Sequence, residues 1–462
     1  MFIGREYELN ELNKYYKRKQ FQFIILYGRR RVGKTYLIKK FIENKKTIFF
    51  SAEESTDYVN LRKISDQLNE FMGFGGNTIQ QSWEDVFNSI ADISKKEKII
   101  LVIDEFPYIQ QSNKGFMSIL QHSIDHRLKD TEVMIIASGS SISFMENEMI
   151  AHRSPLYGRI TGQIFLKPFD YFDASKFFDN FTYEEKIEAY CILGGIPQYL
   201  NKFDDRKSIK ENIIEYILNP SEELFEVPMN TLKQELRSPA IYNSIIETIA
   251  SGSSRSNEIS TKIGVPATTI LKYIETLMRL HIIKRETPIL SNTKKKTIYS
   301  IDDHLFKFIH AYVYRYRSLI EIGMGEAVFE KKIKDDYYKY IGLNFERVCL
   351  EYLIRENKNL KLPFLVEEFG RWWGGNPITK KEEEIDIVGI DKNNGLYVEC
   401  KYRNEKFKLN QLKELIQKSN LVYRNNKYYY IFSKNEYSKD LKDYAIQMSN
   451  VKLIGLRDLF EI

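Results

Sequence analysis

The sequence Gly28-Arg29-Arg30-Arg31-Val32-Gly33-Lys34-Thr35 matches the phosphate-binding loop pattern G-x-x-x-x-G-K-[ST] at every required position. An apolar run at residues 21–27 predicts a buried strand before it, and residues 36–42 predict a helix after it. In that order the two glycines allow backbone amides to turn toward phosphate oxygens at a helix N-terminus. We therefore expect this loop to bind a nucleoside triphosphate, with Lys34 on the β- and γ-phosphates and the Thr35 hydroxyl on Mg²⁺.

Two carboxylates follow a second strongly apolar run. Residues 98–103 predict a buried parallel strand, and Asp104 and Glu105 come directly after it. Adjacent acids after a strand also occur by chance, but downstream of a phosphate loop they form the expected second half of a hydrolysis site. We expect Asp104 to hold Mg²⁺ and Glu105 to orient and deprotonate the attacking water.

Further strands are predicted at 47–51, 133–137 and 163–166. The small residues Ser138-Gly139-Ser140-Ser141 either place a hydroxyl near the γ-phosphate or form an ordinary turn. Arg159 is either a surface residue or an arginine finger that stabilises transition-state charge. As a finger it would act in its own site or in that of a neighbouring subunit, so the sequence leaves open whether the protein forms a homo-oligomer.

Short motifs resemble those of the archaeal-type ATPase family, which belongs to the AAA+-like and STAND-like P-loop ATPases. Besides the phosphate loop, these motifs are Gly4-Arg5-Glu6, Ile103-Asp104-Glu105, Gly139-Ser140-Ser141, Gly158-Arg159 and Gly195-Ile196-Pro197. The resemblance spans residues 1–215 and implies ATP binding, a five-stranded parallel sheet, a helical lid and nucleotide-gated conformational change. It favours the finger role for Arg159. One departure is Gln198, which stands near the position where related enzymes often carry a lid arginine.

Residues 221–310 have the pattern of a winged helix-turn-helix domain. Predicted helices around 241–249 and at 256–263 are followed by a turn at Gly264 and a third helix from Pro266 to about Leu280. Thr268, Thr269 and Lys272 lie near the start of the third helix. Strands at 282–285 and 296–300, joined by a tip at Lys294-Lys295-Lys296, would form the wing. Such a domain either contacts DNA or serves only for protein docking.

The last domain, residues 340–462, combines a helix at 342–356 carrying Glu346 with strands at 364–373, 384–390 and 395–401. Residues 391–395 predict a hairpin between the last two strands. Glu399 and Lys401 are two residues apart and share a face, on which Asp386 of the paired strand can converge, while Cys400 points away. These side chains form either a solvated ion-pair ladder or a magnesium site with an adjacent ammonium group. The apolar neighbours of Asp386 and Glu399 favour the magnesium site.

This arrangement resembles the PD-(D/E)xK restriction-endonuclease-like superfamily. With Gly370-Arg371-Trp372-Trp373, it is similar to the domain of unknown function often fused to archaeal-type ATPases. The resemblance implies metal-dependent phosphodiester cleavage with Asp386, Glu399 and Lys401 as catalytic residues. Glu346, Asp386 and Glu399 would be the metal ligands.

Composition and charge limit the classes of protein and the kinds of partner that remain possible. The chain has 462 residues, a formal charge of +6 and three scattered cysteines, Cys191, Cys349 and Cys400. The cysteine pattern predicts neither a disulfide framework nor a zinc site, and no signal peptide or membrane-spanning run is legible. We expect a cytoplasmic protein that does not associate with membranes. The basic excess is compatible with a polyanionic partner but is small.

The predicted fold is α/β. In order, we expect a P-loop AAA+-like ATPase core at 1–168, a helical lid at 169–220 and the winged helix at 221–310. A helical connector at 311–339 and the nuclease-like domain at 340–462 follow. The leading hypothesis is an ATPase that couples ATP hydrolysis to DNA binding and metal-dependent DNA cleavage. The alternatives are a nucleotide-controlled switch or scaffold with an inert nuclease-like domain, and a chaperone-like or signalling ATPase.

Overall fold

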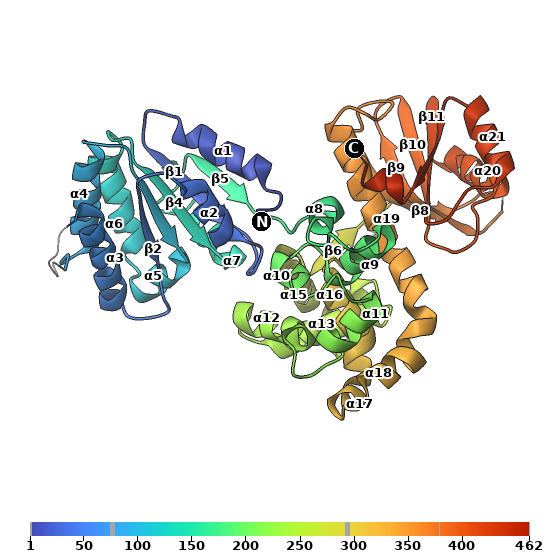
Figure 1. The fold of residues 1–462 in the computed structure, drawn as a ribbon, viewed down its shortest axis with the longest axis horizontal. Coiled ribbons are helices and arrows are strands. Elements are labelled where there is room, and N and C mark those ends of the chain that lie inside the picture. The colour runs from blue at the N-terminus through green and yellow to red at the C-terminus, as the bar shows by residue number, and fades with distance from the viewer. Residues whose placement is uncertain (1, 74–78, 292–295, 378, 462) are drawn as a thin grey trace. The chain divides into compact units, whose positions relative to one another are not determined.

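The computed structural model describes residues 2–73, 79–291, 296–377 and 379–461. The chain divides into two compact units (Figure 1). The first is Met1–Pro168 with Ile196–Gln198, and the second is Phe169–Gly195 with Tyr199–Ile462. Within the described residues, no helix combines the length and apolar character needed to cross a membrane.

The first unit is built on a five-stranded parallel sheet, as predicted. Its strands are β1 (Gln22–Tyr27), β2 (Thr47–Ser51), β3 (Ile100–Asp104), β4 (Met134–Gly139) and β5 (Gly162–Phe165). They lie in the order β2-β3-β4-β1-β5, and each pair is parallel. The central strands are apolar along almost their whole length because both faces of the sheet are buried.

Helices cover both faces of this sheet (Figure 1). One face packs against α1 (Glu6–Tyr16) and α2 (Lys34–Ile42), with Leu12, Leu37 and Phe41 buried on Ile24 and Val102. The other face packs against α3 (Asp57–Met72), α4 (Trp83–Ser94), α5 (Phe106–Ser112) and α6 (Phe116–Ser123). This three-layer arrangement leaves the carboxyl ends of the strands free to present polar side chains.

The second unit begins with the segment predicted as a lid. It contains α8 (Tyr171–Ser175), α9 (Tyr183–Leu193), α11 (Ile209–Asn212) and a π-helix at Ile213–Ile217, while α10 (Pro197–Leu200) starts in the first unit. Most of this segment therefore clusters with the carboxy-terminal half of the chain.

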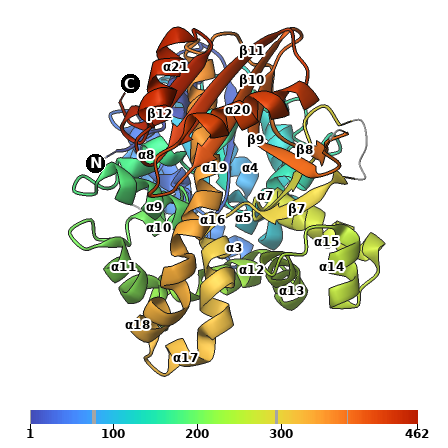
Figure 2. The same cartoon turned by 90° about the vertical axis from the view of Figure 1, so that its right-hand side faces the viewer.

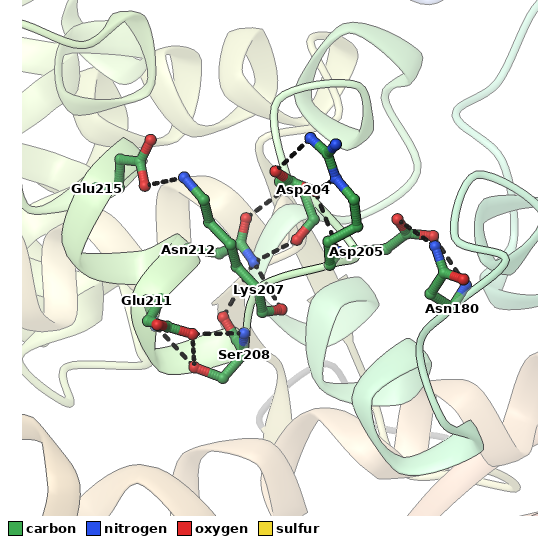
Figure 3. Close-up of polar contacts among 9 residues, drawn as sticks. Asn180, Asp204, Asp205, Lys207, Ser208, Glu211, Asn212 and Glu215 are labelled. Atoms are coloured by element: carbon green, nitrogen blue, oxygen red, sulfur yellow. Dashed lines mark hydrogen bonds and ion pairs between the residues drawn. The ribbon is translucent and has the colours of Figure 1, made fainter.

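A buried asparagine organises the loop before α11 (Figure 3). Asn212 is fully buried; its Oδ1 accepts from the Asp204 amide at 2.7 Å. Its Nδ2 donates to the carbonyl oxygens of Asp204 and Ser208 at 2.9 and 3.0 Å. Around it lie exposed pairs such as Lys207–Glu215 and Ser208–Glu211. The asparagine thus satisfies backbone groups that the turn would otherwise leave buried and unpaired.

We expect Asn212→Ala to lower the free energy of unfolding of the second unit by about 3 kcal/mol, because several buried backbone groups lose their partner. Urea denaturation in a Trp83→Phe background checks this, since Trp372 and Trp373 then report on the second unit alone. The control Glu215→Ala removes only a surface ion pair and should cost less than about 1 kcal/mol. Equal losses in the two variants would contradict the central role of Asn212.

A 3-10 turn at Glu223–Glu226 and the helix α12 (Val227–Glu235) come next, and three more helices and a small sheet follow them. α13 (Pro239–Ala250), α14 (Ser256–Ile263) and α15 (Ala267–Arg279) precede an antiparallel pair of β6 (Ile283–Glu286) and β7 (Ile298–Ile301). Gly264 has a φ of 73°, which suits glycine after α14. Pro266 is the N-cap of α15, not its first helical residue as predicted. Of the predicted basic tip, Lys294 and Lys295 lie outside the described residues.

Short helical turns form the end of the predicted winged helix and most of the predicted connector. Before residue 311 lies α16 (His304–Phe308), and after this helix come turns at Ile309–Val313 and Tyr314–Tyr316, α17 (Arg317–Glu321), α18 (Gly325–Val328) and a turn at Phe329–Ile333. They lead into α19 (Lys334–Lys358), which begins earlier than the predicted helix at 342–356.

The carboxy-terminal sheet is mixed (Figure 2). Its strands are β8 (Glu368–Gly375), β9 (Glu382–Ile390), β10 (Asn394–Lys401), β11 (Asn426–Ser433) and β12 (Val451–Gly455), in the order β12-β11-β10-β9-β8. β8, β9 and β10 are antiparallel neighbours, whereas β10, β11 and β12 are parallel. α20 (Leu409–Lys418) and α21 (Lys439–Gln447) complete this part.

A buried glutamate joins α9 to this carboxy-terminal part. Glu188 accepts hydrogen bonds from the hydroxyl groups of Tyr337 at 2.9 Å and Tyr402 at 3.3 Å. Burial raises the pKa of Glu188 to about 7. An ionised Glu188 therefore costs folding free energy.

We expect this cost to appear as a pH dependence that Glu188→Gln removes. Between pH 4.5 and 7 the unfolded chain ionises at Glu188 while the folded chain keeps its proton, so wild-type stability falls relative to the variant as pH rises. The difference should grow by about 3 kcal/mol over this window and then level off. Urea midpoints from pH 4 to 8 measure it, with Glu405→Gln at an exposed position as control. Parallel curves for wild type and Glu188→Gln would contradict the expectation.

Candidate functional site

The phosphate-loop residues lie between β1 and α2. Lys34 is buried at the start of α2, and its Nζ donates to the carbonyl oxygens of Gly28 at 3.0 Å and Arg29 at 3.1 Å. Gly33 has a φ of 95°, and a Cβ on Gly28 would lie 2.4 Å from the Leu166 carbonyl oxygen. Both glycines are therefore required by the backbone path of this loop.

Asp104 connects the loop to the end of β3. The Thr35 hydroxyl donates to Asp104 Oδ2 at 2.9 Å, and the Ser138 hydroxyl donates to Asp104 Oδ1. All three side chains present oxygen atoms, which are the ligand atoms that Mg²⁺ prefers. The residues predicted to hold Mg²⁺ in the first unit thus lie together and fit that ion.

Glu105 has an unusual backbone conformation. It is the N-cap of α5 with a φ of 52°, in the left-handed region that costs a non-glycine residue about 1–2 kcal/mol. The Ser140 amide and hydroxyl donate to Glu105 Oε2 at 3.3 and 2.9 Å. The hydroxyl groups of Ser138 and Ser140 thus both contact the acids, and a role of one of them near the γ-phosphate stays a prediction.

Two arginines of the first unit have defined partners. Arg159 forms a two-point ion pair with Asp125, at 3.1 Å from Nε and 2.8 Å from Nη2, and also donates to the Tyr157 carbonyl. Its guanidinium lowers the pKa of the Asp125 carboxyl. Arg5, which has no role in the sequence prediction beyond its motif, is buried and donates to the carbonyl oxygens of Val32 and Lys167. These hydrogen bonds tie the phosphate loop, at Val32, to the segment that follows β5, at Lys167.

The predicted residues of the carboxy-terminal site lie on α19, β9 and β10. Asp386 and Glu399 are each 9% exposed, so both are buried as predicted. Asp386 Oδ2 accepts from the Cys400 amide at 2.8 Å, and Lys401 Nζ lies 2.5 Å from Glu399 Oε1. Val398 pairs with Ile387, a register that would place Glu399 opposite Asp386 one residue further on.

Electrostatic interactions connect these groups. Burial and the Glu399 carboxylate raise the pKa of Asp386 to about 6, while burial and Asp386 raise that of Glu346 to about 7. Burial acts against the charge of Lys401, but Glu399 and Asp386 raise its pKa. Buried carboxylates of this kind suit a divalent cation, although the described residues contain no group of three acidic, histidine or cysteine side chains in metal-binding geometry. Glu399 is instead held by Lys401.

A cavity of about 500 Å³ opens beside these acids. Glu346 and Asp386 line it from α19 and β9, and Lys284, Lys307 and Arg371 line it from β6, α16 and β8. The sequence prediction missed all three basic residues as site residues. Two signals were available: the lysine within the apolar stretch Leu305-Phe306-Lys307-Phe308, since burying a charge there has a cost, and Arg371 within the motif Gly370-Arg371-Trp372-Trp373.

Two domain families match the chain. One, described as an ATPase domain predominantly from Archaea, matches residues 2–203. The other, described as archaeal and bacterial proteins of unknown function, matches residues 309–414.

Individual proteins are similar over different lengths. The uncharacterized protein MJECL04 of Methanocaldococcus jannaschii is 34% identical over 454 residues, covering 96% of this chain and 98% of the relative. The uncharacterized ATP-binding protein MJ0423 of the same organism is 59% identical over 46 residues, or 10% of this chain and 78% of that protein. The solved Walker-type ATPase PABY2304 of Pyrococcus abyssi has a TM-score of 0.52 and 22% identity. That match covers 67% of this chain and 96% of the other, and indicates a shared fold.

Proposed function

Since this chain belongs to the same family as MJECL04 of M. jannaschii and carries an ATPase domain of a type found predominantly in Archaea, we propose that it hydrolyses ATP and couples this cycle to DNA processing. The observation that carries the first part is the 2.9 Å contact between Thr35 and Asp104 beside a Glu105 side chain held by Ser140. This contact supports the proposal because the loop, the proposed metal ligands and the proposed base then share one sheet edge.

Each residue of this site has one role in the proposal. Lys34 contacts the β- and γ-phosphates, moving its ammonium group from the loop carbonyls to the nucleotide. Thr35 and Asp104 would hold Mg²⁺, whose charge would offset that of the phosphates. Glu105 orients the attacking water and accepts its proton. Arg159 would first leave Asp125 before stabilising the γ-phosphate, in its own site or in that of a second copy of the chain.

DNA binding is proposed for α15 of the winged-helix segment. Thr268 and Lys272 are exposed near its N-terminal end, where a recognition helix contacts the groove and the backbone. The basic end of the following hairpin, at Lys296, would contact phosphates.

DNA cleavage is proposed for the carboxy-terminal domain. Glu346 and Asp386 face a shared cavity, and Glu399 lies beside Asp386. These carboxylates would hold a divalent cation, which supplies an acidified water and charge stabilisation when bound. Lys401 would stabilise the negative charge that develops on the phosphate group. The order α19-β8-β9-β10, with its antiparallel strands, supports the resemblance to nuclease-like domains.

A second candidate is a nucleotide-controlled switch or scaffold with an inert nuclease-like domain. The ion pair between Lys401 and Glu399 favours it, because that pair occupies two predicted catalytic groups. Under this candidate, DNA still binds and alters ATP turnover, but it is not cut.

One experiment separates these functions. ATP turnover and strand cleavage are measured for the full chain with linear duplex, single-stranded and branched DNA, in Mg²⁺ and in Mn²⁺. We expect hydrolysis that DNA stimulates and cleavage of at least one DNA form. Stimulation without any cleavage would establish the scaffold. ATP hydrolysis that no DNA affects would indicate a chaperone-like or signalling ATPase. Absence of ATP hydrolysis would refute the first part of the proposal, on which the rest depends.

A further inference from the structure

The cavity beside the carboxy-terminal acids is bounded by two parts of the chain that the sequence assigns to different domains. Residues of β6 and α16 form one side, and residues of α19, β8 and β9 form the other. The predicted nuclease-like site is therefore not an open surface of the last domain. It is closed on one side by the hairpin segment of the winged helix.

The segment that follows β6 is firmly attached to β8. The Ile289 amide donates to the Arg371 carbonyl oxygen at 2.9 Å. The Ile289 side chain is 3% exposed, packs within the core of the carboxy-terminal sheet, and would lie 3.1 Å from a Cβ on Gly370. This backbone pairing covers the edge of β8 and holds β6 against the cavity.

Two of the basic residues of the cavity, Lys307 and Arg371, are incompletely neutralised, whereas Lys284 forms an ion pair with Glu286 at 3.0 Å. Lys307 Nζ donates to the neutral Asn344 Oδ1 at 2.8 Å, and among the described residues no carboxylate lies within ion-pair distance of it. Arg371 binds Glu384 through Nη2 at 2.7 Å, but its Nε is buried without an acceptor. Burial and the nearby Lys284 ammonium lower the pKa of Lys307. A half-buried cation on α16 and a buried unpaired donor on β8, on opposite sides of the cavity, favour an anionic ligand between them.

The size of the cavity limits what that anion can be. About 500 Å³ lies within the range of small-ligand pockets, roughly 300–1,000 Å³. Such a space admits a nucleotide but no segment of double helix. The anion would then also lie near Glu346 and Asp386, which line the same side as Arg371, and there a phosphate ester would be positioned for the proposed chemistry.

We propose that this cavity binds the phosphorylated end of a single nucleic-acid strand, with Lys307 and Arg371 contacting the terminal phosphate and β6 excluding a duplex. The inference rests on the proposed function, because it specifies the form of nucleic acid that reaches the carboxy-terminal domain. It assigns the hairpin segment a role in selecting that form.

Binding without cleavage tests this assignment. Fluorescence anisotropy is measured in EDTA on the full chain carrying Lys34→Ala, so that neither catalysis nor the phosphate loop contributes. The probes are short labelled oligothymidylates with a 5′-phosphate, a 3′-phosphate or neither, and a phosphorylated blunt duplex. Unlabelled thymidine monophosphate and inorganic phosphate serve as competitors.

We expect one phosphorylated strand to bind about tenfold tighter than the unphosphorylated strand, and Lys307→Met to abolish this difference. Arg371→Met provides a second variant if Lys307→Met does not fold. The control Lys331→Met, at an exposed position, should keep the difference. Equal binding of all strands, equal binding of the duplex, or equally strong competition by the monophosphate or phosphate would overturn the proposal. Because no cleavage is measured, an inert nuclease-like domain leaves this result unaffected.

Discussion

A Lys34→Ala variant is expected to bind ATP at least about a hundredfold more weakly than wild type and to hydrolyse it at background rate. The reason is the loss of charge-assisted hydrogen bonds to the β- and γ-phosphates, each worth about 1.5–3 kcal/mol. Binding of a fluorescent ATP analogue and release of phosphate measure the two effects. The fold should persist, because alanine favours helix and the hydrogen bonds of Lys34 to Gly28 and Arg29 stay within its own loop.

The matched control is Lys39→Ala. Lys39 lies on the same helix, α2, but is exposed. The Lys39→Ala variant should bind and hydrolyse ATP like wild type. This result would show that the effect of Lys34→Ala depends on where the positive charge lies and not merely on the loss of one positive charge. Hydrolysis by Lys34→Ala at more than half the wild-type rate would show that the loop is not the site of turnover.

An Asp386→Asn variant is expected to lose DNA cleavage by at least about a hundredfold while ATP turnover stays unchanged. Even residues that only support a metal ligand contribute about 10–100-fold, so loss of a ligand carboxylate should exceed that range. Asparagine can still accept the hydrogen bond of the Cys400 amide at Oδ1. It also removes repulsion from Glu399 and Glu346, so the thermal midpoint should not fall.

The control for this variant is Asp391→Asn in the adjoining hairpin. Asp391 accepts from the amides of Asn393 and Asn394 and does not line the cavity, and asparagine suits the same turn. It should cleave like wild type. Cleavage that survives Asp386→Asn would remove this domain from the reaction, and loss in both variants would point to an effect on the hairpin itself.

Much of the first unit could be predicted from the sequence because its signals are local. The strands at 22–27, 47–51, 100–104 and 134–139 are short apolar runs whose boundaries lie close to the predicted ones. Asp104 and Glu105 could be placed at the sheet edge because parallel strands deliver their carboxyl ends together. The partner of Arg159 could not be predicted, since Asp125 lies on another element and no periodicity connects the two.

Fewer contacts of the carboxy-terminal domain could be predicted from the sequence. Alternation along β9 and β10 predicted that Asp386 and Glu399 approach each other, and both are buried. It left open whether Lys401 pairs with Glu399 in an ion-pair ladder or lies beside a metal site, because a flexible lysine selects its partner only in three dimensions. The roles of Ser138 and Ser140 were likewise undecidable from a run of small residues.

The sequence by itself determined the phosphate loop, the order of the strands along the chain and the identity of the acids, because hydrophobic period and glycine spacing act over a few residues. Only the tertiary structure decided which distant groups meet. It brought Lys284, Lys307 and Arg371 from three elements around one cavity with Glu346 and Asp386. Contacts of this kind depend on how whole elements pack, and no short pattern encodes them.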